Sequence, residues 1–180
     1  QKQLREFIDK VNADEGETIL KRDYGKEKVY KGEVENKADD LPKWLTYVDG
    51  NGKIDLVKFK QELDNGQVNT IIEKNQQVKH QSSPQWRNQV KQALRSSKET
   101  PKSLLFKSID PQLIVDQYGG TGILQSRKNN KCVDEYVTLP YEAGTTFDRS
   151  LGKYVKTNRV QIKYTKNGVH VFPIKEGGKK

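Results

Sequence analysis

The stretch RVQIKYTKNGVHVFPI, residues 159–174, decides how we expect this chain to fold. Two runs of alternating apolar and polar residues meet at Asn167-Gly168, a dipeptide typical of the turn in a two-residue β-hairpin. With that turn, Thr165 would lie directly opposite His170 on the neighbouring strand. The stretch therefore predicts a terminal antiparallel hairpin.

Strand side chains alternate between two faces, so the predicted hairpin separates its residues into two groups. The apolar group is the expected core face and contains Val160, Ile162, Tyr164, Val169, Val171 and Pro173. The second group contains Gln161, Lys163, Thr165, His170 and Phe172. A base, a hydroxyl and an imidazole on one rigid surface are a candidate active site. The alternative interpretation is that this face is polar only because the outside of a terminal hairpin meets water.

The sequence before the hairpin predicts helices first and strands afterwards. Helical spacing or helix boundary signals mark residues 2–12, 55–63, 69–79, 83–96 and 110–118. The period then changes to two, so that residues 121–125 and 131–139 are expected to be strands, followed by a loop that contains Gly144. This order predicts an α+β fold in which helices pack on one face of an antiparallel sheet of about four strands.

Two of the expected helices have clear internal or boundary signals. In the helix that starts at Ser83-Pro84, the predicted buried stripe consists of Trp86, Val90 and Leu94. Asp110 and Pro111 have the residue types preferred at an N-cap and at the first helical position. The run Gly119-Gly120-Thr121-Gly122 is expected to stop that helix and turn the chain, with a phosphate cradle as the less favoured interpretation.

Charge divides the chain into two parts. Residues 1–72 contain 13 Lys and Arg against 15 Asp and Glu, whereas residues 73–180 contain 20 against 9. The second part therefore carries the entire positive surplus, and a lysine-rich surface binds phosphates with release of counterions. We expect residues 1–68 to be an extension or connector and residues 69–180 to be a basic domain that binds nucleic acid.

Composition also excludes several classes of protein. Hydrophobic and charged residues each make up 32% of the chain, which indicates a thin core. No apolar run approaches the roughly 20 residues of a membrane span and no basic amphipathic helix stands out, so we expect no membrane partner. The single cysteine, Cys132, excludes an internal disulfide and is expected to be a small core residue. Because the chain starts at Gln1 and lacks methionine, we expect it to be a piece of a longer protein.

The segment DGNGKID, residues 49–55, partly matches a calcium-binding loop. Asp49, Asn51 and Asp55 would be oxygen ligands, but Lys60 stands where a bidentate glutamate is needed. A tight turn is the better interpretation. The sequence therefore predicts neither a metal site nor a cofactor.

The chain has only two histidines, His80 and His170. Imidazole is the side chain best suited to take and give protons near neutral pH. In RNA cleavage by transesterification, a base removes the 2′-hydroxyl proton and an acid protonates the leaving 5′-oxygen, and no metal is needed. Two histidines in a basic domain are thus candidates for an acid/base pair. The structural alternatives are a His80 that interacts with a helix dipole and a His170 that only pairs across strands with Thr165.

An ordered series of short motifs resembles the polymorphic toxin type 50 domain, a family assigned to the superfamily of barnase, EndoU, colicin and RelE-like ribonucleases. The motifs are Val78-Lys79-His80, Lys102-Ser103, the run YGGTG at residues 118–122, Thr157, and residues 162–173. Residues 1–66 show no such likeness. The resemblance implies a metal-independent endoribonuclease whose product carries a 2′,3′-cyclic phosphate.

The resemblance also implies roles for individual residues and partners. The implied catalytic residues are His80, His170, Lys79 and Thr165, with the two histidines as the acid/base pair. The implied substrate-binding residues are Lys163, Thr157, Arg159, Thr121 and Tyr164. RNA is the expected partner, with DNA as a second candidate and a cognate immunity protein as a possible inhibitor.

Domains of this family stand at the C-terminus of long secreted toxins or of phage minor head proteins. The resemblance therefore implies either delivery to the cytoplasm of a target cell or association with a virion. The rival interpretation is a non-catalytic region of a phage minor head or ejection protein that binds nucleic acid.

Overall fold

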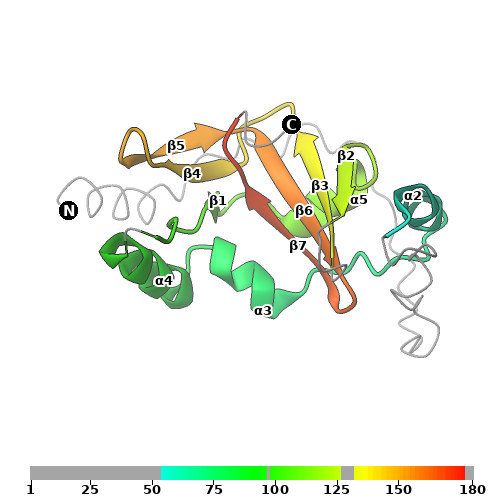
Figure 1. The fold of residues 1–180 in the computed structure, drawn as a ribbon, viewed down its shortest axis with the longest axis horizontal. Coiled ribbons are helices and arrows are strands. Elements are labelled where there is room, and N and C mark those ends of the chain that lie inside the picture. Colours follow the sequence, from blue (N-terminus) through cyan, green and yellow to red (C-terminus); the bar gives the residue numbers. More distant parts are fainter. Residues whose placement is uncertain (1–53, 97, 127–131, 177–180) are drawn as a thin grey trace.

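The computed structural model describes residues 54–96, 98–126 and 132–176 (Figure 1). The helices are α2 (Leu56–Asp64), α3 (Lys74–Gln77), the 3₁₀ turn η2 (Val78–His80), α4 (Pro84–Arg95) and α5 (Pro111–Tyr118). The strands are β1 (Leu104–Leu105), β2 (Ile123–Ser126), β3 (Val133–Thr138), β4 (Gly144–Asp148), β5 (Lys153–Thr157), β6 (Arg159–Thr165) and β7 (Gly168–Pro173). None of the helices in these ranges has the length and apolar composition of a membrane span.

The strands form two antiparallel sheets, which confirms the α+β class. The larger sheet has the order β2-β3-β6-β7 and the smaller one β1-β4-β5. The loop expected around Gly144 is instead the start of the β4–β5 hairpin. Alternation gave no signal there because the buried positions at the start of β4, Gly144 and Thr145, are on both faces of the strand and neither is a large apolar residue.

The helix predictions are confirmed for α2, α4 and α5, whose N-caps are Asp55, Ser83 and Asp110. Asp55, considered above as a calcium ligand, accepts hydrogen bonds from the first backbone N–H groups of α2. The helix expected over residues 69–79 is wrong in its first half, because the α-helix begins only at Lys74. The expected helix over residues 2–12 and the turn at residues 49–51 lie outside the described residues.

The terminal hairpin forms, but its register differs from the predicted one. Its two turn residues are Lys166-Asn167, and Gly168 is already the first residue of β7. His170 therefore lies opposite Lys163 rather than opposite Thr165. Because the partner changes by two residues, an even number, every side chain remains on the face expected for it.

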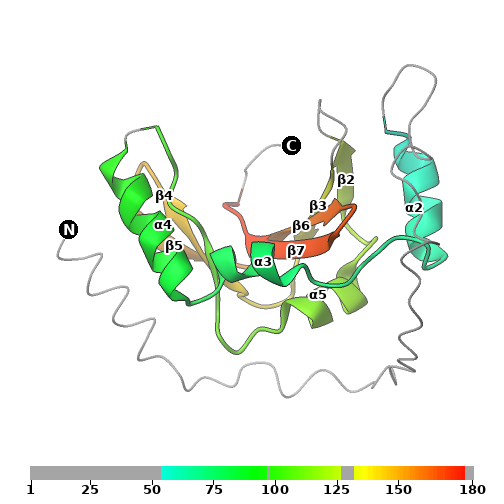
Figure 2. The same ribbon diagram turned by 90° about the horizontal axis from the view of Figure 1, so that it is seen from below.

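The core face of the larger sheet carries the apolar residues expected from the hairpin. Five of them are 0% exposed: Val160, Ile162, Tyr164, Val169 and Val171. Helix α5 lies along this face (Figure 2), and Phe59 of α2 packs edge-on against Tyr164 with ring centroids 5.4 Å apart. Ile54, Phe59 and Val68 share this core, so the described part of the N-terminal region packs on residues 69–180.

A second, smaller core joins α4 to the smaller sheet. Trp86 and Val90 pack there with Leu104 and Tyr154. The predicted stripe of α4 is correct at Trp86 and Val90. It is wrong at Leu94, which is 42% exposed, because Ala93 is buried in its place.

A buried carboxylate, Glu135 on β3, holds the glycine-rich turn that follows α5. It is 0% exposed and accepts hydrogen bonds from the backbone N–H groups of Gly120 and Gly122 and from the Tyr164 hydroxyl, the last at 2.6 Å. Burial and the adjacent negative charge raise the pKa of Tyr164, which keeps its hydroxyl a donor. The turn N–H groups are thus bound inside the protein, which supports the helix-stop interpretation over the phosphate cradle.

We expect Glu135→Ala to lower the free energy of unfolding by about 3–5 kcal/mol, because the buried Tyr164 hydroxyl and the part-buried N–H groups of Gly120 and Gly122 lose their acceptor. Urea denaturation of the full chain measures this change. Glu142→Ala is the control, since that carboxylate is exposed and lies 3.4 Å from Lys156, and it should cost no more than about 1 kcal/mol. Equal losses in the two variants would contradict the anchoring role of Glu135.

Candidate active site

The outer edge of β7 is covered by the chain that leads to His80. The Val169 N–H donates to the Ile71 carbonyl at 2.9 Å, and the Glu73 N–H donates to the Val169 carbonyl at 2.7 Å. Gly168 is required for this approach, since a Cβ there would lie 2.4 Å from the Ile71 carbonyl oxygen. The glycine that the sequence pattern assigned to the turn therefore serves the contact between β7 and the preceding segment.

Gln77, at the end of α3, continues this pairing with its side chain. Its Nε2 donates to the Val171 carbonyl at 2.8 Å, and the Val171 N–H donates to its Oε1 at 2.7 Å. One amide that is 1% exposed thus satisfies both backbone groups of a strand residue, as a neighbouring strand would. His80 follows three residues later in η2, and His170 precedes Val171, so Gln77 ties the two histidine-bearing segments together.

The two histidines, which are 90 positions apart in the sequence, lie side by side in the structure. Their ring centroids are 6.0 Å apart with an interplanar angle of 14°. Phe172 completes the group, with its ring 4.5 Å from His80 and 5.5 Å from His170. His80 is 7% exposed and His170 is 8% exposed. The histidines therefore meet in a stacked, largely buried cluster and not across an open gap.

His80 is oriented by Ser103. Its Nδ1 lies 3.3 Å from both the carbonyl oxygen and the hydroxyl of Ser103. A proton on Nδ1 would donate to that carbonyl, which leaves Nε2 as the basic nitrogen. The preceding residue is held as well, because the Lys102 carbonyl accepts from Trp86 Nε1 at 3.1 Å and from the Tyr154 hydroxyl at 2.9 Å. The smaller core therefore fixes the segment that orients His80.

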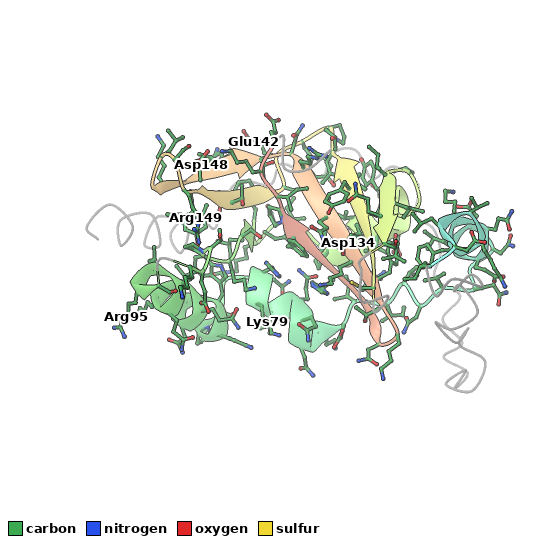
Figure 3. All side chains as sticks on the ribbon, in the orientation of Figure 1. Lys79, Arg95, Asp134, Glu142, Asp148 and Arg149 are labelled. Carbon is green, nitrogen blue, oxygen red and sulfur yellow. The ribbon has the colours of Figure 1, made fainter. Side chains whose placement is uncertain are left out.

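His170 belongs to a polar row that crosses the larger sheet. The strand registers place Gln125, Asp134, Lys163 and His170 on adjacent strands of that sheet. Figure 3 shows Asp134 over these strands and Lys79 on the helical segment beside β7. Lys163 is the centre of the row, because it is the direct cross-strand neighbour of both Asp134 and His170.

Two buried side-chain nitrogens on this face have no hydrogen-bond partner among the described residues. They are Nδ1 of His170 and Nε2 of Gln161, which lies on β6 next to the row. A buried polar atom without a partner costs about 1–3 kcal/mol of stability, so native proteins retain few of them. A polar ligand on this face would supply the partners that these two nitrogens lack.

Burial and positive charge lower the pKa values of both histidines. Loss of hydration is the largest cause, and it lowers the pKa of His80 from 6.5 to about 3 and that of His170 from 6.5 to about 4. The charges of Lys79 and Lys102 lower both values further, and that of Lys163 lowers the pKa of His170. The Asp134 carboxylate raises the pKa of His170 but does not cancel these effects, so both rings are neutral at pH 7 and three lysines outnumber one carboxylate around them.

The remaining residues expected on this face take different positions along it. Lys79 is half-buried, and its Nζ donates to the Gln76 side chain at 2.7 Å. The Thr165 hydroxyl donates to the Gly168 carbonyl at 3.0 Å, which ties it to the hairpin end. Arg159 lies four residues before Lys163, which is about 13 Å along the strand, and its guanidinium is 5.9 Å from the Tyr136 ring.

Three expected substrate-binding residues use their hydroxyls in hydrogen bonds within the fold. Tyr164 is on the core face with its hydroxyl on Glu135. Thr121 lies in the turn that Glu135 holds, and its hydroxyl donates to the last carbonyl of α5 at 2.7 Å. Thr157 is 4% exposed and donates to the Ile174 carbonyl at 2.9 Å. These hydroxyls stabilise the fold, so none of the three enters the candidate site.

Sequence reasoning did not assign site roles to Gln77, Ser103 and Phe172. Ser103 stands in the Lys102-Ser103 motif, which is the signal that could have identified it. Gln77 has no such signal, because its role depends on where β7 lies. Within the described ranges, no group of three or more His, Cys, Asp or Glu side chains is arranged to hold a metal ion.

We expect Gln77→Ala to destabilise the chain by about 2–5 kcal/mol, because both backbone groups of Val171 lose their partner. It should also change the NMR chemical shifts of both imidazoles, since the two segments are no longer joined. Gln92→Ala on the exposed face of α4 is the matched control and should leave stability and shifts unchanged. Unchanged imidazole shifts in Gln77→Ala would show that Gln77 does not set the histidine contact.

The lowered pKa values predict a pH-dependent stability. Between pH 6.5 and about 4 the unfolded chain binds more protons than the folded one, so stability is full above pH 6.5 and falls as the pH drops. The slope should approach about 1.4 kcal/mol per pH unit for each histidine. Unfolding free energies from pH 7.5 to 5 measure it, and His170→Asn should remove the share of one histidine. A constant stability over this range would contradict the burial of the rings.

Comparison with known proteins gives a family match that covers the candidate site. The family model described as bacterial toxin 50 matches residues 72–173, which is more than half of the chain. The matched range starts at the residue that bridges to β7 and ends at the last residue of β7, and it contains both histidines and the lysines around them. No curated protein and no solved structure matches the chain. The chain therefore belongs to the bacterial toxin 50 family.

Proposed function

We propose that this toxin domain is a metal-independent endoribonuclease that cleaves RNA by attack of a 2′-hydroxyl on the adjacent phosphate. The observation that carries the proposal is the contact between His80 and His170 in a setting of three lysines. The two imidazoles supply a base and an acid, and the lysines supply the positive charge that a phosphodiester needs. The family supports the toxin role, and the site supports this particular chemistry.

In the proposed reaction His80 is the base. With Nδ1 hydrogen-bonded to the Ser103 carbonyl, its Nε2 accepts the proton of the 2′-hydroxyl. The 2′-oxygen then bonds to phosphorus, and the bond from phosphorus to the 5′-oxygen breaks. His170, whose pKa is the less depressed of the two, donates a proton to the leaving 5′-oxygen. The products are a 2′,3′-cyclic phosphate and a 5′-hydroxyl end.

In this proposal the negative charge of the bound substrate allows one imidazole to hold a proton near neutral pH. A phosphate bound between Lys79 and Lys163 brings a negative charge to the cluster and raises the imidazole pKa values from their depressed levels. One ring can then hold a proton near neutral pH while the other stays neutral, which is the state that acid/base catalysis requires. In this proposal Thr165 shapes the hairpin end of the site, and Arg159 extends the positive surface along β6.

The same proposal includes the route and the partners of the domain. As a bacterial toxin domain, it would reach the cytoplasm of a target cell as part of a larger secreted protein or of a virion. A cognate immunity protein would protect the producing cell by covering the histidine face.

The alternative function is a non-catalytic region of a phage minor head or ejection protein that binds nucleic acid. The positive surplus of residues 73–180 favours it, since net charge alone supports affinity for any polyanion. The histidine cluster has no role in that function. Binding of DNA and RNA without cleavage would therefore favour the alternative.

Incubation of the full chain with RNA in EDTA tests the proposed function. We expect cleavage to fragments with 2′,3′-cyclic phosphates, and no cleavage of an oligonucleotide with 2′-deoxyribose throughout. His80→Ala and His170→Ala should each lower the rate by about 10²–10⁴-fold, because each removes a proton-transfer group. Lys58→Ala, an exposed change on α2, should leave the rate unchanged. Intact RNA, or cleavage only after a divalent ion is added, would refute the proposal.

A further inference from the structure

We propose that a pocket beside the histidine cluster binds the nucleotide next to the scissile phosphate, an inference that rests on the proposed function. The pocket lies between the start of α4 and the loop that follows β1, and its volume is about 370 Å³. That volume lies at the lower end of the range typical of small-molecule sites. None of the residues assigned above to catalysis lines it.

Two chain segments lead directly from the histidine cluster into this pocket. Gln81 follows His80 in the chain and lines one wall. Leu105 and Phe106 line another wall, and they follow Ser103, whose carbonyl and hydroxyl contact His80. An RNA strand with one phosphate at the histidines would therefore bring an adjoining nucleotide to the pocket.

The apolar part of the pocket suits a nucleobase. Leu105 and Ile109 are 2% and 5% exposed and form a rigid apolar base, and Phe106 adds a half-buried aromatic ring. Unpaired bases of single-stranded RNA bind proteins by stacking on such rings. The Gln81 side chain both donates and accepts hydrogen bonds, as recognition of a base edge requires.

The charged part of the pocket suits a phosphate. Arg87 from α4 and Lys107 from the loop after β1 contribute two cations to its lining. Lys156 lies nearby, with its Nζ 6.0 Å from the centroid of the Phe106 ring, but its charge is paired with Glu142 at 3.4 Å. None of the lining residues is acidic. An acidic peptide would meet these charges without using the ring, so the combination of ring, amide and cations favours a nucleotide.

Binding measurements on the full chain with His170→Ala, which disables cleavage, test the pocket. Fluorescence anisotropy with labelled single-stranded RNA of mixed sequence gives the affinity over a range of salt concentrations. Arg87→Ala combined with Lys107→Ala should weaken binding by about tenfold or more and lower the slope of log affinity against log salt by about 0.7 for each phosphate that is no longer neutralised. Phe106→Leu keeps apolar volume, and it should weaken binding by about tenfold without changing that slope.

Arg95→Ala is the matched control, because Arg95 projects outward from the same helix as Arg87 and does not line the pocket (Figure 3). It should leave RNA affinity unchanged. Circular dichroism checks folding, and the Arg87 and Lys107 changes carry the test if Phe106→Leu fails to fold. If the pocket variants bind RNA as tightly as Arg95→Ala does, the proposal that the pocket binds a nucleotide is wrong.

The outcomes separate this proposal from the proposed function. If the unmodified chain cleaves RNA and the pocket variants keep their affinity for RNA, nucleotide binding by the pocket is refuted and the ribonuclease function stands. If the unmodified chain does not cleave RNA but the pocket variants bind it more weakly, the ribonuclease function fails and the nucleotide site stands. Equal reductions of affinity for RNA and for a polyglutamate peptide would overturn the assignment to a nucleotide.

Discussion

The side-chain amide of Gln77, paired with the backbone of Val171, is the interaction on which the candidate site depends. β7 is an edge strand, and an edge strand exposes unpaired backbone groups unless something covers them. Here the cover is the segment that carries His80, and the strand it covers carries His170. The same pairing therefore covers the edge of the sheet and brings the two histidines into contact.

The two faces of the larger sheet differ: one packs in the core, and the other carries the candidate site. On the core face, Glu135 and Tyr164 form a fully satisfied buried group that holds the glycine-rich turn. On the opposite face, His170 and Gln161 retain buried atoms without partners, and the pKa values of His80 and His170 are depressed. Buried polar atoms without hydrogen-bond partners are expected at functional sites, where stabilising contacts elsewhere in the fold offset their cost. The contrast between the two faces is an observation, separate from the family match, that supports the proposed site.

Membership in the bacterial toxin 50 family and the geometry of the site support the proposed function from independent directions. The family gives the role of a toxin, and the neutral histidine pair among lysines gives a chemistry that an anionic substrate would activate. The pocket between α4 and the loop after β1 is proposed to bind a second position on the RNA, the nucleotide next to the scissile phosphate. Its walls are continuous in sequence with His80 and Ser103, so in this proposal a substrate bound at one position would be directed to the other.

The sequence by itself determined the α+β class, the starts of α4 and α5, and the two faces of the terminal hairpin, because period and cap chemistry are local. It also singled out His80, His170 and Lys163 as candidates. Only the tertiary structure decided the hairpin register, the smaller sheet, and the removal of Tyr164, Thr121 and Thr157 from the site. These depend on which segments meet: Gly168 serves a contact with Ile71 rather than the turn, and Gln77 acquires its role only when β7 lies beside it. Local patterns carry no information about such contacts between distant parts of the chain.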